Sequence, residues 1–462
     1  MKTCIDVPVS RFLASPLEWM NLYRRSHVDQ VQLYVGGIPA TAPLDDTARA
    51  REMLLSAGFD TAAIAVPVGH PTDSRQAPSP EEIARHSRPL WRFRTGRNGA
   101  PEYFSHELTD RMISDTLSYV RDYASLGFTL FFMDDDLRSA NLQQEVGGCF
   151  CPDCMAAFKA ETGFDSLEGD AALTAWTRFQ SRRVTRVMEG MRKYLPHPGI
   201  MIMIHGDERH GISVPDLAKI DGIHVRVGEE HFFDGSARTV QGRAEEFMAV
   251  SSHLYRLKGV EETYSESTAV DARSFPTQTL TTPEHMYSKA LLALTAGVKN
   301  IDWMCEKHWD MMAARNGDLR AFAEAASGKR AWPVHVARHS QVAGRGLYPD
   351  LTATLLGVPA AGVFAPEADG GEVLVISSDL LALPEWKAAA EKYTHVLPMG
   401  DDLPAALRRT GVPMLEKGTA LVSWIPDKRR AAVYNPQETL QTVALFGQEI
   451  TLPAGEAACV DQ

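Results

Sequence analysis

The sequence is poor in the two features that mark membrane and secreted proteins, which are long apolar runs and paired cysteines. No segment of the 462 residues approaches the roughly 20 consecutive apolar residues that a membrane helix needs. The stretch after Met1 is too short and too interrupted for a signal-peptide core. Of six cysteines, three lie within residues 149–154, which favours reduced thiols or a metal site over a disulfide framework. These absences predict a soluble, cytoplasmic protein with no membrane partner.

Basic residues are also in deficit. Lysine and arginine number 47 against 59 aspartates and glutamates, so the formal net charge is -12. Nucleic acid rewards a basic face, and we therefore expect no nucleic-acid partner. A neutral, hydroxyl-rich ligand such as a carbohydrate is compatible with this charge. The hydrophobic fraction of 44% is ordinary for a folded protein, and the length predicts one large domain with one or two small ones.

The first two thirds of the chain alternate between short, β-rich apolar runs and amphipathic helical stretches. This alternation indicates parallel βα units. Eight such units predict a (β/α)₈ TIM barrel, an α/β fold that usually takes about 250 residues plus loop insertions. We expect the barrel strands at residues 4–9, 31–35, 61–68, 129–133, 200–204, 222–227, 260–265 and 300–304.

Beyond about residue 336 the pattern changes. Predicted helices and strands alternate on a smaller scale, and from about residue 419 short strands are separated by turns at Pro426-Asp427 and Asn435-Pro436. We therefore assign residues 1–335 to the catalytic barrel, 336–415 to a small α/β domain and 416–462 to a C-terminal β module.

Acidic residues follow the fourth predicted strand and occupy the seventh. In such a barrel, catalytic groups lie where strands end and βα loops begin. Asp134, Asp135 and Asp136 come directly after the fourth strand, and Glu262 and Glu266 lie at the seventh. Retaining glycoside hydrolysis needs two carboxyl groups about 5–5.5 Å apart, one protonated and one ionised. Because these two strands lie on opposite sides of a barrel, their carboxyl groups can face each other across its mouth.

The order of these acids along each strand suggests their roles. Mutual repulsion raises the pKa of at least one aspartate in the triplet, and Asp136, nearest the open end, is the predicted acid/base. Alternation places Glu262 and Glu266 on one face, and Glu266, nearer the carboxyl end, is the predicted nucleophile, with Glu262 as the alternative. A polar helix cap is the competing interpretation of the aspartates, since Asp is a common N-cap residue.

Two motifs resemble the β-galactosidases of glycoside hydrolase family 42 and related clan A enzymes. The fourth strand ends in MDDD at residues 133–136, and CFCPDCMAAF follows at residues 149–158. The family has Asn-Glu at the end of that strand and a CxCxxC…AF loop after it. The resemblance implies that Asp135 replaces the asparagine and Asp136 replaces the acid/base glutamate, one methylene shorter. Tyr264-Ser-Glu266, Ser274-Phe-Pro276 and Tyr287-Ser-Lys289 are similar to the region that carries the nucleophile.

The resemblance also implies an activity and an assembly. It implies a retaining O-glycosyl hydrolase that cleaves a β-linked galactoside- or glucoside-type glycoside or a small oligosaccharide. The small α/β domain is similar to the trimerisation domain of that family, so we expect a homo-oligomer. No cofactor is expected for hydrolysis itself.

The cysteine cluster is predicted to be structural. Cys149, Cys151 and Cys154 supply three soft ligands for Zn²⁺, whose structural sites take four. Family 42 enzymes often add a cysteine from the loop after the third strand. That loop lacks cysteine here, and its histidines His70, His86 and His106 are the candidate replacements. The alternative is three buried, reduced cysteines that pack a loop.

Further substrate contacts are expected from polar and aromatic residues at the predicted strand ends, although each alone is a weak signal. Two other classes of function are compatible with the same residues. One is a divalent-metal-dependent barrel isomerase or hydrolase, and the other is a non-catalytic carbohydrate-binding barrel. The predicted substrate-binding residues are Asp134, Asp135, Arg138, His205, Asp207, Arg226, His231, Tyr264, Trp303 and Glu306.

Overall fold

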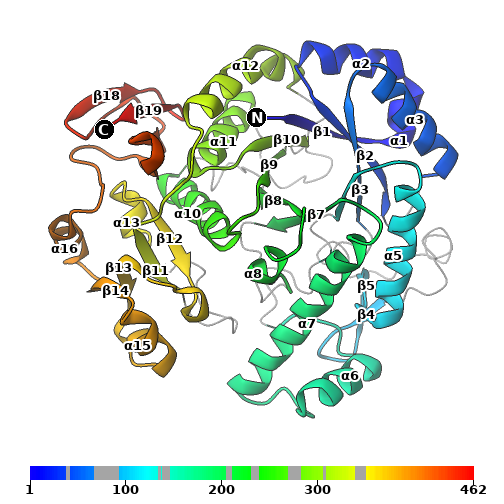
Figure 1. The fold of residues 1–462 in the computed structure, drawn as a ribbon, viewed down its shortest axis with the longest axis horizontal. Helices are drawn as coiled ribbons and strands as arrows, with labels where there is room; N and C mark the ends of the chain where they lie inside the picture. The colour runs from blue at the N-terminus through cyan, green and yellow to red at the C-terminus, as the bar shows by residue number, and fades with distance from the viewer. Residues whose placement is uncertain are drawn as a thin grey trace.

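The computed structural model describes residues 1–37, 42–66, 93–133, 137, 146–203, 211–229, 239–268, 282–304, 308–338 and 350–462. Eight parallel strands close into a barrel in the order β1-β10-β9-β8-β7-β6-β3-β2 (Figure 1). The predicted (β/α)₈ barrel is confirmed. Its strands are β1 (Thr3–Pro8), β2 (Gln30–Gly37), β3 (Asp60–Val66), β6 (Leu130–Met133), β7 (His197–Met203), β8 (His224–Glu229), β9 (Glu262–Thr268) and β10 (Asn300–Met304).

Helices surround the barrel, and local sequence signals fix their ends. Thr109 and Thr282 cap two of them, each accepting a backbone N–H in the first turn, and Gly297 ends the second in a left-handed conformation. None of the described helices is long and apolar enough to cross a membrane. The helices are α1 (Val9–Ala14), α2 (Pro16–Arg25), α3 (Leu44–Ser56), α5 (Asp110–Ala124), α6 (Pro152–Thr162), α7 (Asp170–Met191), α8 (Val214–Leu217), α10 (Val240–Arg256), α11 (Pro283–Ala296) and α12 (Trp309–Ala325).

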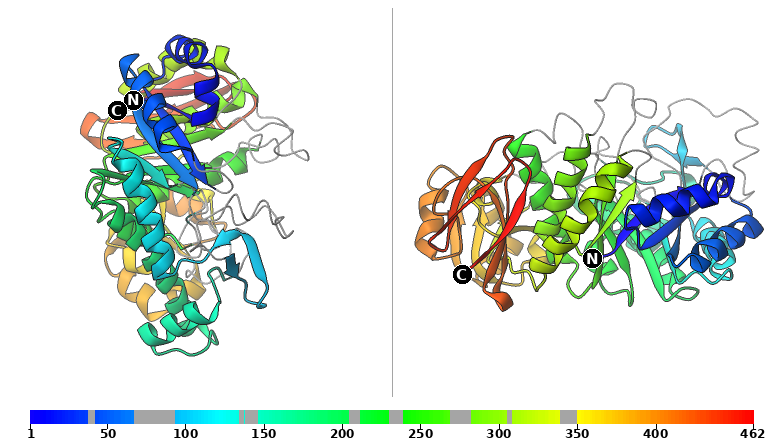
Figure 2. Two further views of the ribbon diagram at one scale, coloured as in Figure 1. Left: turned by 90° about the vertical axis from the view of Figure 1, so that its right-hand side faces the viewer. Right: turned by 90° about the horizontal axis from the view of Figure 1, so that it is seen from above.

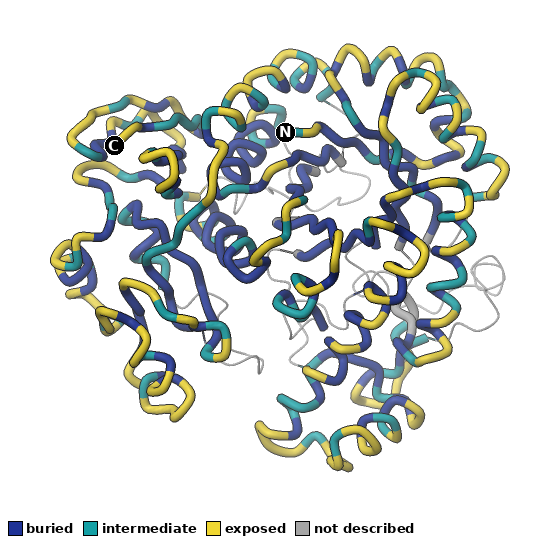
Figure 3. The backbone as a smooth tube through the Cα atoms, viewed as in Figure 1, coloured by how far each residue is buried: buried dark blue, intermediate teal, exposed yellow. Residues whose placement is uncertain are grey.

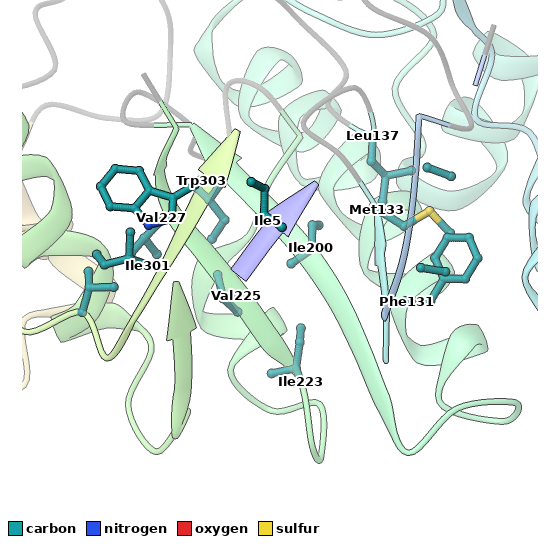
Figure 4. Packing of buried hydrophobic residues seen from close by; sticks show 14 of the residues in the cluster. Ile5, Phe131, Met133, Leu137, Ile200, Ile223, Val225, Val227, Ile301 and Trp303 are labelled. Atoms are coloured by element: carbon teal, nitrogen blue, oxygen red, sulfur yellow. The ribbon is translucent and has the colours of Figure 1, made fainter. Parts of the chain in front are cut away.

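The strands are buried on both faces, as expected for a parallel sheet covered by helices (Figure 3). Alternate residues such as Ile5, Val225 and Ile301 point outward and pack in the large core under the helices (Figure 4). The opposite set points into the barrel, where Phe132 and Tyr264 belong to a separate apolar cluster. The barrel interior is therefore a packed core, and only its two ends can hold polar chemistry.

Two smaller units follow the barrel, which completes the predicted fold class. A four-stranded parallel sheet has the order β12-β11-β13-β14, and an antiparallel sheet β15-β16-β19 is accompanied by the hairpin β17-β18. The elements are β11 (Val334–Ala337), α13 (Thr352–Leu355), β12 (Ala360–Val363), η3 (Ala365–Glu367), β13 (Gly371–Ile376), α14 (Ser378–Leu381), α15 (Pro384–Ala390), β14 (Tyr393–Pro398), α16 (Leu403–Thr410), β15 (Leu421–Ile425), η4 (Pro426–Lys428), β16 (Arg430–Tyr434), β17 (Gln441–Leu445), β18 (Gln448–Leu452) and β19 (Ala457–Asp461).

Both units dock on the helices that follow β8, β9 and β10 (Figure 2). Arg256, at the end of α10, makes a two-pronged ion pair with Glu367, with N–O distances of 2.7 and 2.8 Å. Ser288 on α11 and Tyr434 on β16 share a hydrogen bond of 2.5 Å. One side of the helical layer is thus covered by the C-terminal units.

Between β3 and α5 the chain forms a short hairpin that the sequence analysis did not predict. It consists of β4 (Phe93–Thr95) and β5 (Pro101–His106), joined by a turn with Gly99 at φ 78°. The carbonyl of Thr95 accepts a hydrogen bond from the backbone of Phe150 at 2.8 Å. The hairpin therefore holds the cysteine loop against the barrel.

Gly199 on β7 gives a test of the barrel packing. A Cβ atom there would lie 2.5 Å from the ring of the fully buried Phe132, so we expect Gly199→Ala to lower the free energy of unfolding by about 1–3 kcal/mol. The matched control is Gly317→Ala on α12, where a Cβ meets nothing within 4 Å. That variant should gain about 0.5–1 kcal/mol from helix propensity. Urea denaturation should show a lower free energy of unfolding for Gly199→Ala and a higher one for Gly317→Ala. Equal changes in the two variants would contradict the close contact between Gly199 and Phe132.

Candidate active site

The upper part of the barrel interior, near the carboxyl ends of the strands, holds a charged cluster centred on Arg226. The guanidinium Nη2 donates to both carboxylate oxygens of Asp6 at 2.9 Å and to Gln32 Oε1 at 2.7 Å. It also forms an ion pair with Asp302, and Nη1 lies 3.5 Å from Glu266 Oε2. The side chains of Arg226 and Asp302 are fully buried, Glu266 is 1% exposed and Asp6 is 8% exposed. Three carboxyl groups and one guanidinium thus share a buried site.

Strand alternation and register bring these side chains to one level. Asp6, Glu266 and Asp302 each lie two residues before the carboxyl end of their strands, β1, β9 and β10. Asp302 is directly paired with Glu266 across the β10–β9 ladder. Since active sites of such barrels form at the carboxyl ends of the strands, the cluster lies directly beneath the expected site.

An aromatic ring forms the floor of the cluster. The guanidinium carbon of Arg226 lies 4.8 Å from the centroid of the Phe132 ring, a favourable cation–π geometry. Burial raises the pKa of the Asp6 carboxyl above its ordinary value of 3.8, although the charge and hydrogen bonds of Arg226 oppose the rise. Burial in the barrel interior therefore favours the protonated form of Asp6, and Arg226 favours its ionised form.

The lower end of the barrel, at the amino ends of the strands, also holds polar side chains, but they form a separate hydrogen-bonded group. Glu262 is the first residue of β9, at its amino end, and its Oε2 accepts from Asn300 Nδ2 at 2.9 Å and from the Tyr264 hydroxyl at 3.3 Å. The Tyr264 oxygen also lies 3.0 Å from His224 Nδ1. Glu262 lines a cleft of about 650 Å³ at this end together with Lys2. The predictions of Glu262 as alternative nucleophile and of Tyr264 as substrate contact are wrong, because both face away from the carboxyl ends.

Two further predicted substrate contacts, Trp303 and Arg226, are fully buried. Trp303 points outward from β10 into the helical layer (Figure 4), where it is fully buried and its indole N–H donates to Asn316 Oδ1 on α12 at 3.2 Å. It is a packing residue and cannot stack on a sugar. Arg226 is fully buried inside the barrel, and its printed contacts include Glu266, whose Oε2 lies 3.5 Å from Nη1. The other predicted site residues, Asp134, Asp135, Asp136, Arg138, His205, Asp207, His231 and Glu306, lie outside the described residues.

Asp6, Gln32 and Asp302 were not among the site residues predicted from the sequence. Each is a polar side chain at an inward position of an otherwise apolar strand, as in CIDVP and NIDWM. An isolated acid in a buried strand is costly without a partner, and that cost is the signal that could have identified Asp6 and Asp302.

The cysteine cluster lies at the start of α6, outside the barrel. The sulfur atoms of Cys149, Cys151 and Cys154 lie within 4.8 Å of one another, and all three residues are buried. Cys149 Sγ accepts the backbone N–H of Thr95 at 3.4 Å. Hydrogen bonding from the Cys154 thiol lowers the pKa of Cys149 to about 6 against the opposing effect of burial. The pKa of Cys154 is raised by the same hydrogen bond, and that of Cys151 by burial.

A carboxylate lies beside the three sulfur atoms. Oε2 of Glu107, which is 1% exposed, is 3.7 Å from Cys151 Sγ, and its Oε1 accepts the Thr109 hydroxyl at 3.0 Å. In a tetrahedral zinc site with ordinary bond lengths, neighbouring sulfur and oxygen ligands are separated by roughly 3.5–3.8 Å. The three sulfur atoms therefore fit three positions of a four-coordinate metal ion, whereas the carboxylate of Glu107 is close to Cys151 Sγ but is not within 4.8 Å of all three sulfur atoms. Of the predicted histidine ligands, His70 and His86 lie outside the described residues, as does the side chain of His106.

The sequence matches no protein-family model, and it matches no curated protein sequence. Solved structures do match. The β-galactosidase from Rahnella sp. R3 has a TM-score of 0.71 at 12% identity, over 99% of this chain and 98% of that one. A GH42 β-galactosidase, Gan42B from G. stearothermophilus, has a TM-score of 0.70 at 11% identity, over 99% of this chain and 97% of that one. The β-galactosidase from Halorubrum lacusprofundi reaches 0.63 at 12% identity, over 96% and 81%. At such identities the matches establish the fold.

His224 makes the lower end of the barrel sensitive to acid. Burial, assisted by His197, lowers its pKa from 6.5 to about 3, so the unfolded chain binds its proton more readily than the native protein. Stability should therefore be lost as the pH falls from 6.5 toward 3, by at most about 1.4 kcal/mol per pH unit. His224→Asn, which cannot be protonated, should lose less melting temperature than the wild type between about pH 7.5 and about pH 5. His395→Asn, at an exposed position on β14, is the control. Equal losses of melting temperature in the wild type and both variants would show that His224 is not responsible for the acid sensitivity.

Proposed function

We propose that the protein is a retaining glycoside hydrolase with Glu266 as its nucleophile. The observation that carries the proposal is the placement of Glu266, which points inward near the carboxyl end of the seventh barrel strand with Arg226 Nη1 3.5 Å from its carboxylate. An adjacent positive charge favours the ionised form of a carboxyl group, and a nucleophile must be ionised to attack the anomeric carbon. The fold shared with β-galactosidases supports this choice of reaction.

Asp136 is the proposed acid/base. It lies in the triplet that follows Met133, the last residue of β6, and β6 is three strands away from β9 in the closed barrel. Protonated Asp136 would donate to the leaving oxygen while Glu266 attacks, which forms a glycosyl-enzyme. The same carboxylate would then take a proton from the water that hydrolyses this intermediate, so the configuration is retained. The chain itself supplies both groups, and this chemistry needs no cofactor.

The proposed substrate is a β-linked galactoside- or glucoside-type glycoside or a small oligosaccharide. Three of the similar structures are β-galactosidases, and a fourth, a GH42 exo-carrageenase from Bacteroides ovatus, has a TM-score of 0.56. The net charge of -12 agrees with a neutral sugar as ligand. We also propose a homo-oligomer. The small parallel sheet offers an exposed edge strand, β14, through which copies of the chain could associate.

A structural zinc ion is part of the same proposal. Cys149, Cys151 and Cys154 would hold it. The carboxylate of Glu107, 3.7 Å from Cys151 Sγ, is the proposed fourth ligand and would have to move closer to the other two sulfur atoms when the ion binds. Zinc would stabilise the negative charge of the thiolates and fix the loop before α6 against the β4–β5 hairpin. It would have no part in hydrolysis, because the cluster lies outside the barrel.

Turnover of aryl glycosides tests the nucleophile. Glu266→Gln and Asp136→Asn should each lower kcat by roughly 10³-fold or more, since each removes a group that acts in the transition state. Glu262→Gln is the matched control on the same strand, and it should stay within about one order of magnitude of the wild type. Proton NMR of the first-formed sugar should show retained configuration.

Three results would count against this assignment. An active Glu266→Gln variant would remove the nucleophile, and turnover abolished by a chelator would favour a metal-dependent barrel enzyme. Binding of a sugar without turnover by the wild type would favour a carbohydrate-binding barrel.

Metal analysis tests the zinc site. Purified protein should contain about one zinc per chain, Cys151→Ser should lose it, and Glu107→Gln should bind it roughly 10-fold more weakly. The control is Glu102→Gln, because Glu102 lies on β5, the strand that ends just before Glu107, and pairs with Arg94 instead. Zinc-free protein with unchanged melting temperature in added zinc would instead establish three buried, reduced cysteines. Full zinc affinity in Glu107→Gln would assign the fourth position to another residue.

A further inference from the structure

An aromatic side chain on β2 lies above the charged cluster, toward the carboxyl ends of the strands. Leu33 and Val35 on this strand point outward and pack in the large core under the helices. Alternation therefore turns Gln32 and Tyr34 toward the barrel interior, where Gln32 Oε1 accepts a hydrogen bond from Arg226 Nη2 at 2.7 Å. Tyr34 is the next inward residue, about 6–7 Å further along the strand than Gln32. It therefore lies between the charged cluster and the open end of the barrel.

The burial of Tyr34 differs from that of the other aromatic residues inside the barrel. Phe132 and Tyr264 belong to the inward apolar cluster and are fully buried, whereas Tyr34 packs against the same cluster and is only partly buried. Because helices cover the outer side of β2, where Leu33 and Val35 are fully buried, the accessible part of Tyr34 lies on the inner side. Tyr34 therefore presents surface to a ligand that enters at the carboxyl ends of the strands, where such barrels bind their substrates.

The backbone at Tyr34 is irregular and is held in place from behind. The register of β2 against β3 shifts between Tyr34 and Gly36, so a β-bulge directly follows the tyrosine. Bulges next to active sites commonly change the direction of a side chain. The carbonyl of Val35, within the bulge, accepts the backbone N–H of Ala42 at 2.8 Å and the hydroxyl groups of two tyrosines of α5 at 3.2 and 3.4 Å. These bonds fix the position of Tyr34 before a ligand binds.

We propose that Tyr34 is a substrate-binding residue that holds the sugar ring beside Glu266, with its aromatic ring against the C–H groups of the sugar and its hydroxyl bonded to a sugar hydroxyl. Tyrosine combines an apolar ring with a polar tip that both donates and accepts hydrogen bonds. A pyranose ring offers the matching surface, because C–H groups form its faces and hydroxyl groups lie around its edge. The assignment rests on the proposed function, since the role of Glu266 as nucleophile decides which sugar of the substrate lies here.

The competing role for Tyr34 is packing, and kinetics separate the two roles. A packing residue changes the melting temperature but leaves the KM of the folded enzyme unchanged. Loss of a contact that substrate and transition state share raises KM with little change in kcat. Tyr34→Phe keeps the ring and removes only the hydroxyl, so KM should rise roughly 3–10-fold at an unchanged melting temperature. Tyr34→Leu also removes the ring and should raise KM by at least about 10-fold.

The experiment measures kcat, KM and melting temperature of the wild type and both variants with aryl β-galactosides and aryl β-glucosides. The matched controls are Tyr194→Phe and Tyr194→Leu, because Tyr194 is 41% exposed and lies between α7 and β7, at the amino end of the barrel. Their KM should stay within about twofold of the wild type. Calorimetric titration of Glu266→Gln with galactose and with glucose, with and without Tyr34→Leu, measures binding in the absence of turnover.

A raised KM in both Tyr34 variants, with the Tyr194 variants unchanged, supports the inference. A lower melting temperature of Tyr34→Leu at an unchanged KM would assign Tyr34 to packing and overturn it. If Tyr34→Leu does not fold, Tyr34→Phe decides, and an unchanged KM in that variant overturns the inference. Sugar binding that Tyr34→Leu weakens, without turnover of any glycoside by the wild type, would reject the proposed hydrolase and still support Tyr34 as a sugar contact. Absence of both binding and turnover would overturn both proposals.

Discussion

Burying one guanidinium among three carboxyl groups constrains most of the barrel at once. Arg226 from β8 meets side chains from β1, β2, β9 and β10, and the Phe132 ring from β6 lies beneath it. A buried charge without its partners is strongly destabilising, so each of these strands must deliver its side chain to the same point. The interaction that fixes the register of the upper barrel is therefore also the one that sets the charge around Glu266.

The polarity along the barrel axis locates the chemistry. At the lower end, Glu262, Tyr264 and His224 form a hydrogen-bonded group in which the imidazole stays neutral, because burial holds its pKa near 3. Apolar side chains such as Phe132 and Ile64 fill the middle layer. The buried carboxyl groups clustered around Arg226 lie above this layer, close to the carboxyl ends of the strands. Within the described barrel interior, the end where several carboxyl groups are brought together is the end at which such barrels place their chemistry.

The architecture was predictable because parallel βα units repeat with a strong apolar pattern, and the strand at 300–304 was predicted with its observed bounds. Alternation also correctly grouped Glu262, Tyr264 and Glu266 on the inner face. Alternation could not predict how far along the barrel axis each side chain lies, because that position depends on the stagger between neighbouring strands. The seventh strand was predicted at 260–265 but runs from Glu262 to Thr268, which made Glu262 look closer to the mouth than it is. Trp303 was misassigned because the same alternation was not applied to β10, where it lies next to inward-facing Asp302.

The C-terminal units extend this constraint beyond the barrel. Helix α10 contacts β8, the strand that carries Arg226, and on its other side it contacts β12 of the small parallel sheet. Arg256, Tyr255 and Ser252 of this helix bond to Glu367, Asp369 and the backbone of Gly362, respectively. Because the small parallel sheet packs against α10, it limits how far β8 can shift relative to β9 and β10. Since the hold of Arg226 on Glu266 depends on that spacing, the C-terminal sheet contributes to the site without contacting it.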